Sequence, residues 1–142
     1  MKNPNLHQPT HLPERPIMTE RHLRDRGEAY RFLEKLDQDN SFTFQTFNDS
    51  AEANGRLTRV LHGSLEEKLP VLERLNERGA GIFVTVNQTN LKGRKTRNII
   101  GIRAVFADLD GAPLEPVREF GLPPHIIVES SPDRWHAYWL CR

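Results

Sequence analysis

Two carboxylates with one residue between them close an apolar segment of the chain. The stretch VFADLDGAP, residues 105–113, contains Asp108 and Asp110 and follows them with a glycine. In a β-strand such residues point to the same face, and a divalent cation relieves the repulsion between neighbouring carboxylates. Oxygen ligands suit Mg²⁺ or Mn²⁺, so the pattern predicts a metal site. The residues DLDG are also a common turn sequence, and both interpretations are open on these residues alone.

A strand that ends in D-x-D-G is also similar to the nucleophile motif of haloacid-dehalogenase-type phosphatases. In that family Asp108 would attack phosphate and Asp110 would act as an acid. That motif usually opens its domain and continues with Thr or Val, whereas here a helix and two strands are predicted before it and Ala112 and Pro113 follow. The short remainder of the chain leaves no room for the rest of that fold, which disfavours this alternative.

After Asp108 and Asp110, the third candidate site residue is a histidine on an aromatic-rich segment. In HIIVESSPDRWHAYW, residues 125–139, two strand-like runs flank a Ser-Pro-Asp turn, which predicts a β-hairpin. His136 would share one face with Tyr138, and the two tryptophans would share the other face, which we expect to be core. His136 is either a half-buried strand histidine bonded to Glu129 or a catalytic group. With the turn centred on Pro132 and Asp133, the expected pairs are Ser131 with Arg134, Ser130 with Trp135 and Glu129 with His136.

Hydrophobic periodicity predicts the elements that position these residues. Residues 19–38 carry an apolar helical stripe, and Thr19 could cap that helix. Residues 41–49 and 81–88 alternate as strands, and a strand, a helix and a strand in this order suggest a βαβ unit. A long strand is expected over residues 98–110, where the run from Ile99 to Ala107 is, apart from Arg103, apolar enough to be buried.

A second helix is predicted between these two alternating strands. Ser64 and Glu67 fit a capping box at its start, and Gly79 fits a stop at its end. Pro70 cannot donate a backbone hydrogen bond, so it predicts a kink or a late start of this helix.

A basic loop precedes the long predicted strand. Four cations within six residues could attract a nucleic-acid template or a triphosphate. Charge runs are also often only solvated loops, and both interpretations remain open. The four residues are Lys92, Arg94, Lys95 and Arg97.

The bulk composition bounds the class of protein. A chain of 142 residues is about one domain long, and its net charge of +1 means that nucleic-acid binding needs a local patch. The single cysteine, Cys141, excludes an internal disulfide and a cysteine-based zinc cluster. We find neither a signal peptide nor a membrane-spanning run, which predicts a cytoplasmic protein without membrane contact. Residues 1–18, with four prolines, are predicted to be a disordered tail.

Together these motifs resemble a known family. AVFADLD, residues 104–110, resembles the acidic hhhDhD motif of the archaeo-eukaryotic primase superfamily, and SSPDRWHAYW, residues 130–139, resembles its small-residue turn followed by a histidine. The similarity is closest to RepB-like plasmid replication primases. Residues 74–99 also resemble the upstream segment of that family, so the likeness covers roughly residues 30–142.

The resemblance implies an α+β fold with a mainly antiparallel sheet, helices on one face and a partial RNA-recognition-motif-like primase core. It implies a DNA primase, a nucleotidyltransferase that uses Mg²⁺ or Mn²⁺, a DNA template and nucleoside triphosphates to make primers for plasmid or mobile-element replication. A replicative helicase is left open as a partner. Asp108 and Asp110 would be catalytic metal ligands and His136 a catalytic nucleotide ligand, with Ser130, Ser131 and Arg134 also binding nucleotide. One phosphate-bearing substrate must touch both motifs, so we expect the Asp108 strand to lie next to the hairpin that carries His136.

One departure from the family pattern matters. In this superfamily a third acidic motif lies on a later strand, whereas this sequence stops at Arg142, directly after the histidine strand. Glu129 is nearby, but its position does not match that motif. Residues 19–142 therefore resemble the N-terminal part of a primase catalytic domain, and activity of this chain stays open. The alternative is a non-catalytic DNA-binding or replication-accessory module with a degenerate primase fold.

Overall fold

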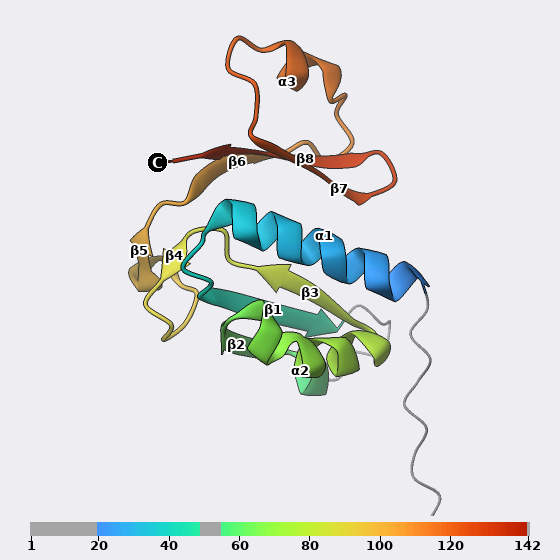
Figure 1. The fold of residues 1–142 in the computed structure, drawn as a ribbon, viewed down its shortest axis with the longest axis vertical. Coiled ribbons are helices and arrows are strands. Elements are labelled where there is room, and N and C mark those ends of the chain that lie inside the picture. The colour runs from blue at the N-terminus through green and yellow to red at the C-terminus, as the bar shows by residue number, and fades with distance from the viewer. Residues whose placement is uncertain (1–19, 49–54, 142) are drawn as a thin grey trace, which may run out of the picture.

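The computed structural model describes residues 20–48 and 55–141, and Figure 1 shows their fold. The predicted tail over residues 1–18 and the predicted cap Thr19 lie outside the described residues. The helices are α1 (Glu20–Leu36), α2 (Leu65–Glu77) and α3 (Glu115–Glu119), with short 3₁₀ turns η1 (Gly55–Leu57) and η2 (Thr96–Asn98). The strands are β1 (Phe42–Asn48), β2 (Arg59–Gly63), β3 (Ala80–Val84), β4 (Gln88–Thr89), β5 (Ile99–Gly101), β6 (Ala104–Asp108), β7 (Ile126–Ser131) and β8 (Arg134–Leu140).

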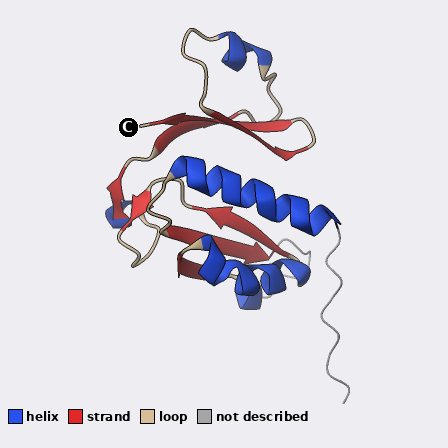
Figure 2. Ribbon diagram, viewed as in Figure 1, coloured by secondary structure: helices blue, strands red, loops and turns tan. Residues whose placement is uncertain are grey.

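The strands form separate antiparallel sheets, which gives a mixed α+β fold (Figure 2). Their orders are β2-β1-β3, β4-β5 and β6-β8-β7. The predicted α+β class and the antiparallel pairing are confirmed, whereas the expectation of one sheet is wrong, because the described strands divide among separate sheets. The predicted βαβ unit that begins at β1 is also wrong, because β1 pairs antiparallel with both β2 and β3. The crossover through α2 instead joins β2 to β3, on either side of β1, and β2 was missed in the sequence.

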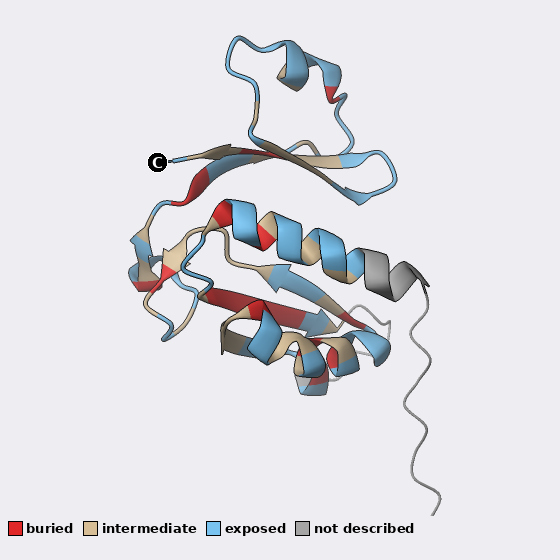
Figure 3. Cartoon of the chain, viewed as in Figure 1, coloured by how far each residue is buried: buried red, intermediate tan, exposed pale blue. Residues whose placement is uncertain are grey.

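Both long helices cover one face of the β2-β1-β3 sheet. Alternation along β1 directs Phe42 and Phe44 toward these helices, and both side chains are almost fully buried. Figure 3 shows how strongly burial concentrates on β1. Removing such apolar side chains from water contributes about 1.5–3 kcal/mol each. The helix residues of this buried cluster are Leu33, Leu36, Leu65 and Leu72.

The β6-β8-β7 sheet lies on the other side of α1 and shares the same core (Figure 1). Ala104 and Tyr138 belong to the buried cluster, and the Tyr138 ring meets the Phe32 ring edge-on at 5.1 Å between centroids. The expectation that the tryptophan face forms the core is therefore wrong for this sheet, although Ala137 on that face is fully buried. Trp135 and Trp139 are half-buried on the opposite face, where the Trp139 indole donates a hydrogen bond to the Leu122 carbonyl.

Helix α2 begins where its capping box predicts. The Ser64 hydroxyl accepts from the Glu67 amide, and the Glu67 carboxylate accepts from the Ser64 amide. The helix then runs through Pro70, so a late start is wrong. Gly79 follows the helix with φ 92°, a left-handed conformation that glycine adopts without strain, and it supplies the predicted stop.

The expected long strand over residues 98–110 is broken into β5 and β6, which belong to different sheets. The break coincides with Arg103, whose guanidinium is buried, pairs with Asp37 and donates to the Ser41 carbonyl at 2.7 Å. The same group lies 4.8 Å from the centre of the Phe42 ring. The expected burial of this run is also wrong, because Ile100, Ile102, Val105 and Phe106 are all more than half exposed.

No helix in the described part of the chain is both long and apolar enough to cross a membrane.

Candidate functional site

Asp108 and His136 lie directly opposite each other on neighbouring strands. They are register partners of β6 and β8, so their side chains share one sheet face. Asp108 Oδ1 lies 3.5 Å from His136 Nε2. The expected proximity of these two side chains is confirmed, whereas their roles toward metal and nucleotide stay predictions.

A bulge in the hairpin changes the predicted partner of His136. Ser131 faces Arg134 as expected, but the register then shifts, and Glu129 faces Trp135 while Val128 faces His136. A one-residue shift moves a side chain to the other sheet face. Glu129 therefore lies on the face away from His136, where its carboxylate accepts from the Asp133 amide at 3.2 Å.

Asp110 lies beyond the end of β6, in a tight turn. Its φ of 41° is left-handed, and its amide donates to Asp108 Oδ1 at 3.0 Å. Its carboxylate forms an exposed ion pair with Arg134. The expectation that Asp108 and Asp110 face the same way along one strand is thus wrong, because the strand stops after the first carboxylate. The alternative interpretation of DLDG as a turn sequence is correct for Asp110.

Tyr138 fixes the other side of the histidine ring. Its hydroxyl lies 3.3 Å from His136 Nδ1. A hydroxyl that donates to Nδ1 leaves the ring proton on Nε2, the nitrogen that faces Asp108. Burial, and to a smaller extent the Asp108 carboxylate, raises the pKa of the Tyr138 phenol above its ordinary value of 10.0. A protonated phenol can donate to Nδ1, and the Asp108 carboxylate can only accept from Nε2, so the two contacts are compatible with one ring tautomer.

The turn residues that were predicted to bind nucleotide have local partners. Arg134 is held by Asp110, and the Ser130 hydroxyl donates to the Arg134 carbonyl at 3.2 Å. Ser130 sits at the bulge, and both serines are exposed beside the Asp108 end of the sheet. The hairpin thus brings Ser130, Ser131 and Arg134 close to one another, at the edge of the candidate site.

The side chains around Asp108 decide whether a metal ion could bind at this site. Within the described ranges, no three or more side chains of His, Cys, Asp or Glu gather to hold a metal ion. A complete protein cage is therefore not present among these residues. Mg²⁺ commonly binds through only one or two carboxylates together with substrate phosphates. The exposed Asp108 carboxylate and the neighbouring Asp110 suit that mode, provided that Asp110 leaves Arg134.

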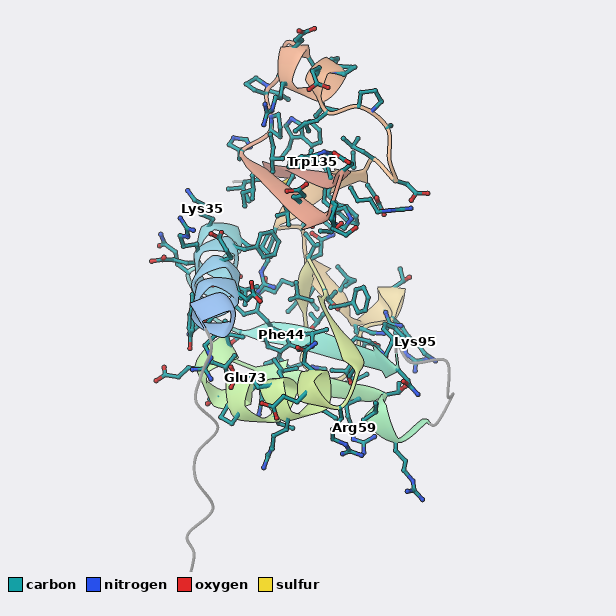
Figure 4. The ribbon with its side chains drawn as sticks, turned by 90° about the vertical axis from the view of Figure 1, so that its right-hand side faces the viewer. Lys35, Phe44, Arg59, Glu73, Lys95 and Trp135 are labelled. Carbon is teal, nitrogen blue, oxygen red and sulfur yellow. The ribbon has the colours of Figure 1, made fainter. Side chains whose placement is uncertain are left out.

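The basic loop lies apart from this pair. Its four cations occupy the connection between β4 and β5, against Val60 and His62 of the β2-β1-β3 sheet. Figure 4 shows Lys95 beside that sheet and Trp135 in the other one. The structure therefore does not bring the loop to the Asp108 strand, although the two are close in sequence.

Two features of the structure were missed in the sequence. The role of Tyr138 in holding His136 could have been inferred, since the two residues are two apart on a strand and share a face. The contact between Phe47 and Phe83, at 5.3 Å between ring centroids, joins distant segments and leaves no local sequence signal.

Comparison with known proteins adds no family assignment. No protein-family model matches the chain, and neither the curated proteins nor the solved structures give a match. A functional proposal therefore rests on the arrangement of Asp108, His136 and Tyr138 and on the motif resemblance.

Proposed function

We propose that this chain is part of a primase-type nucleotidyltransferase domain that binds a nucleoside triphosphate at the Asp108–His136 pair. One observation carries the proposal, namely that the acidic strand and the histidine strand are direct neighbours, with Asp108 Oδ1 3.5 Å from His136 Nε2. The resembling family requires this juxtaposition, because one phosphate-bearing substrate must touch both motifs. The two side chains are also partly exposed, so a ligand can reach them.

His136 is the phosphate-binding group in this proposal. With Tyr138 donating to Nδ1, the Nε2–H group points toward the Asp108 side and can donate to a phosphate oxygen. Arg134, 57% exposed, adds a planar donor that suits phosphate once it leaves Asp110. A bound Mg²⁺ or Mn²⁺ would neutralise phosphate charge and activate the attacking primer hydroxyl. Asp108, with Asp110, would hold that ion together with the triphosphate.

The second candidate is a non-catalytic DNA-binding or replication-accessory module. A specific observation favours it: Asp110 is committed to Arg134, and no third carboxylate joins Asp108 and His136 among the residues that the structure describes. Such a module would bind DNA and would not transfer nucleotides. The phosphatase alternative gains no support, since β6 is an edge strand of an antiparallel sheet and Asp110 is ion-paired.

A calorimetric titration tests the proposal. The chain is titrated with a nucleoside triphosphate in the presence of Mn²⁺, and the same samples are assayed for primer synthesis on single-stranded DNA and for hydrolysis of a small phosphoester. We expect binding that weakens at least about tenfold in Asp108→Asn and in His136→Ala, because each loses one charge-assisted contact. Asp39→Asn, a charge-matched change at an exposed site away from the pair, should bind as the wild type does.

The outcomes separate the candidates. Triphosphate binding with primer synthesis supports the nucleotidyltransferase. DNA binding without triphosphate binding supports the accessory module, and phosphoester hydrolysis lost in Asp108→Asn supports the phosphatase. If the wild type binds no triphosphate at millimolar concentration, or if Asp39→Asn weakens binding as much as Asp108→Asn, the proposed site is wrong.

A further inference from the structure

The β2-β1-β3 sheet has a face that neither long helix covers. We call it the open face and define it by the outward residues of its three strands. Register pairing places His62 opposite Thr43, and both Val60 and Phe83 opposite Gln45, on this face. Phe83 is 53% exposed and Val60 is 42% exposed on the two edge strands, on either side of the buried Gln45 of β1.

An aromatic pair stands on the open face. The rings of Phe47 and Phe83 meet edge-on, with 5.3 Å between centroids and 75° between planes. The Arg94 guanidinium lies 5.5 Å from the centre of the Phe47 ring, within the range of a cation–π contact. An aromatic platform and a cation are thus held together by residues from β1, β3 and the basic loop.

The basic loop is rigidly built. The Asn98 side chain accepts from the Lys95 amide at 3.1 Å and donates to the Asn90 side chain at 3.2 Å. Gly93 has φ 151°, and a side chain there would run into Asn98 Oδ1 at 2.8 Å. The loop backbone is therefore braced from both sides by Asn98, which is 8% exposed. A fixed loop backbone loses less conformational freedom when the cations that it carries bind a ligand.

A buried hydroxyl contact fastens this loop to the open face. The Thr43 hydroxyl lies 2.7 Å from the Thr89 hydroxyl at the start of the loop and 2.8 Å from His62 Nδ1. Thr89 also accepts from the Leu91 amide at 3.1 Å. Loop and sheet consequently form one surface. Figure 4 shows Lys95 and α1 on opposite sides of the sheet.

The loop and the open face enclose a groove of about 700 Å³. No acidic side chain lines it within the described part of the chain, whereas four cations do. We propose that this groove and the Phe47–Phe83 platform bind single-stranded nucleic acid. The cationic and polar lining consists of Lys92, Arg94, Lys95, Arg97 and His62, with Val60 as an apolar wall.

The chemistry favours a single strand over other anions. Cations along a groove neutralise phosphates, and exposed aromatic rings stack on unpaired bases, which a duplex keeps inside its own stack. A free phosphate or an acidic peptide would use the cations and leave the rings unused. The site lies on a different sheet from Asp108 and His136, so the inference does not rest on the proposed nucleotidyl transfer.

Fluorescence anisotropy with a labelled 20-nucleotide oligo-dT, in EDTA and without nucleotides, tests the site. Lys92→Ala/Lys95→Ala removes two groove cations, and Arg74→Ala/Arg78→Ala removes two exposed cations of α2 and its cap as a charge-matched control. Phe83→Ala removes one platform ring, and Phe120→Ala removes a ring that is 66% exposed elsewhere. Each variant is first shown by thermal melting to be folded.

We expect wild-type binding that falls steeply with salt. Losing two phosphate contacts from a single strand should reduce the slope of log K against log salt by about 1.4 in Lys92→Ala/Lys95→Ala. Phe83→Ala should weaken binding about tenfold, the value of one base stack. Both control variants should match the wild type, and a 20-base-pair duplex should bind more weakly than oligo-dT.

Three results would overturn the inference. The first is wild type that does not bind oligo-dT, and the second is equal weakening in the groove variant and its α2 control. The third is duplex or polyglutamate binding as tight as oligo-dT with no effect of Phe83→Ala, which would make the groove a general anion site. Asp108→Asn is expected to keep full oligo-dT binding, so failure of the proposed nucleotidyltransferase site and failure of this groove give different patterns.

Discussion

A histidine that is held at both ring nitrogens is the central feature at the scale of single residues. Tyr138 contacts Nδ1 and Asp108 faces Nε2, so both ring nitrogens have a partner on the same sheet face. Preorganised donors lose little freedom on binding, which is why such a histidine suits phosphate recognition. The turn after β6 has a comparable effect on Asp110, since its amide is tied to Asp108 and its carboxylate to Arg134. The repulsion expected between two bare carboxylates is therefore partly compensated within the protein.

Tyr138 gives a prediction for alkaline pH. Its raised pKa means that, above about pH 10, the unfolded chain releases the phenolic proton more readily than the folded chain. The stabilisation is complete below pH 10 and is lost as pH rises through the folded pKa. We expect Tyr138→Phe to lose stability less steeply than the wild type between pH 10 and 11, measured by urea unfolding.

Tyr30→Phe is the control for this experiment, because Tyr30 and Tyr138 are the two tyrosines of the chain. Absorbance at 295 nm in the Tyr30→Phe protein then follows Tyr138 alone and should titrate above 10.0. An identical alkaline loss in wild type and Tyr138→Phe would contradict the assignment.

At the scale of elements, the break between β5 and β6 decides which residues reach the candidate site. Arg103 is buried with Asp37 and stacks on Phe42, and its backbone amide donates to Asn87 Oδ1 at 3.0 Å. These contacts turn the chain from one sheet into the other. Without the break, Asp108 would not arrive beside β8.

Arg103→Ala should be strongly destabilising. It leaves the Asp37 carboxylate, 16% exposed, without its partner, and breaking a buried ion pair costs about 3–5 kcal/mol. Arg59→Ala is the matched control, because Arg59 is exposed and its guanidinium donates to the carbonyl of the adjacent Thr58. Urea unfolding followed by circular dichroism measures both. A loss below about 1 kcal/mol in Arg103→Ala would show that the break does not depend on this residue.

The elements that the sequence predicted well are those set by local contacts. The start of α2 follows from Ser64 and Glu67, which bond to backbone atoms within the same turn. The turn of the hairpin follows from Pro132 and Asp133, where Asp133 adopts φ 61°. The break at Arg103 could not be predicted, because it depends on Asp37 and Phe42, which are distant in sequence. The bulge at Ser130 could not be predicted, because a register shift of one residue leaves no sign in the apolar pattern of the hairpin.

Only part of the candidate site could be predicted from the sequence. The motif pattern placed Asp108 and His136 together, and the register confirms that proximity. The position of Asp110 depended on where β6 ends, and DLDG fits a strand end and a turn equally well. The contact between Phe47 and Phe83 on the open face could be predicted only with the order of the three strands known, and hydrophobic periodicity does not reveal that order.

At the scale of the whole molecule, α1 joins two sheets into one core. Its residues Leu33 and Leu36 belong to a buried cluster that also contains Phe44 of one sheet and Tyr138 of the other. Helix α1 lies between the two three-stranded sheets, and α2 covers the same face of the β2-β1-β3 sheet beside it (Figure 1). Sheets of this size need such a covering layer for stability. The nucleotide site proposed on one sheet and the nucleic-acid groove proposed on the other therefore share one hydrophobic core.

This shared core predicts a single unfolding transition. Both tryptophans, Trp135 and Trp139, lie on β8, so tryptophan fluorescence reports on the β6-β8-β7 sheet, whereas far-ultraviolet circular dichroism is dominated by α1 and α2. We expect the two urea transitions to coincide in the wild type.

Leu33→Ala, which removes a side chain that is 4% exposed, should lower both midpoints together and cost about 2–5 kcal/mol. Leu122→Ala, a matched truncation at a residue that is 59% exposed, should leave both midpoints nearly unchanged. If fluorescence changed at lower urea than circular dichroism, or if Leu33→Ala shifted only one signal, the two sheets would unfold separately and the common core would be wrong.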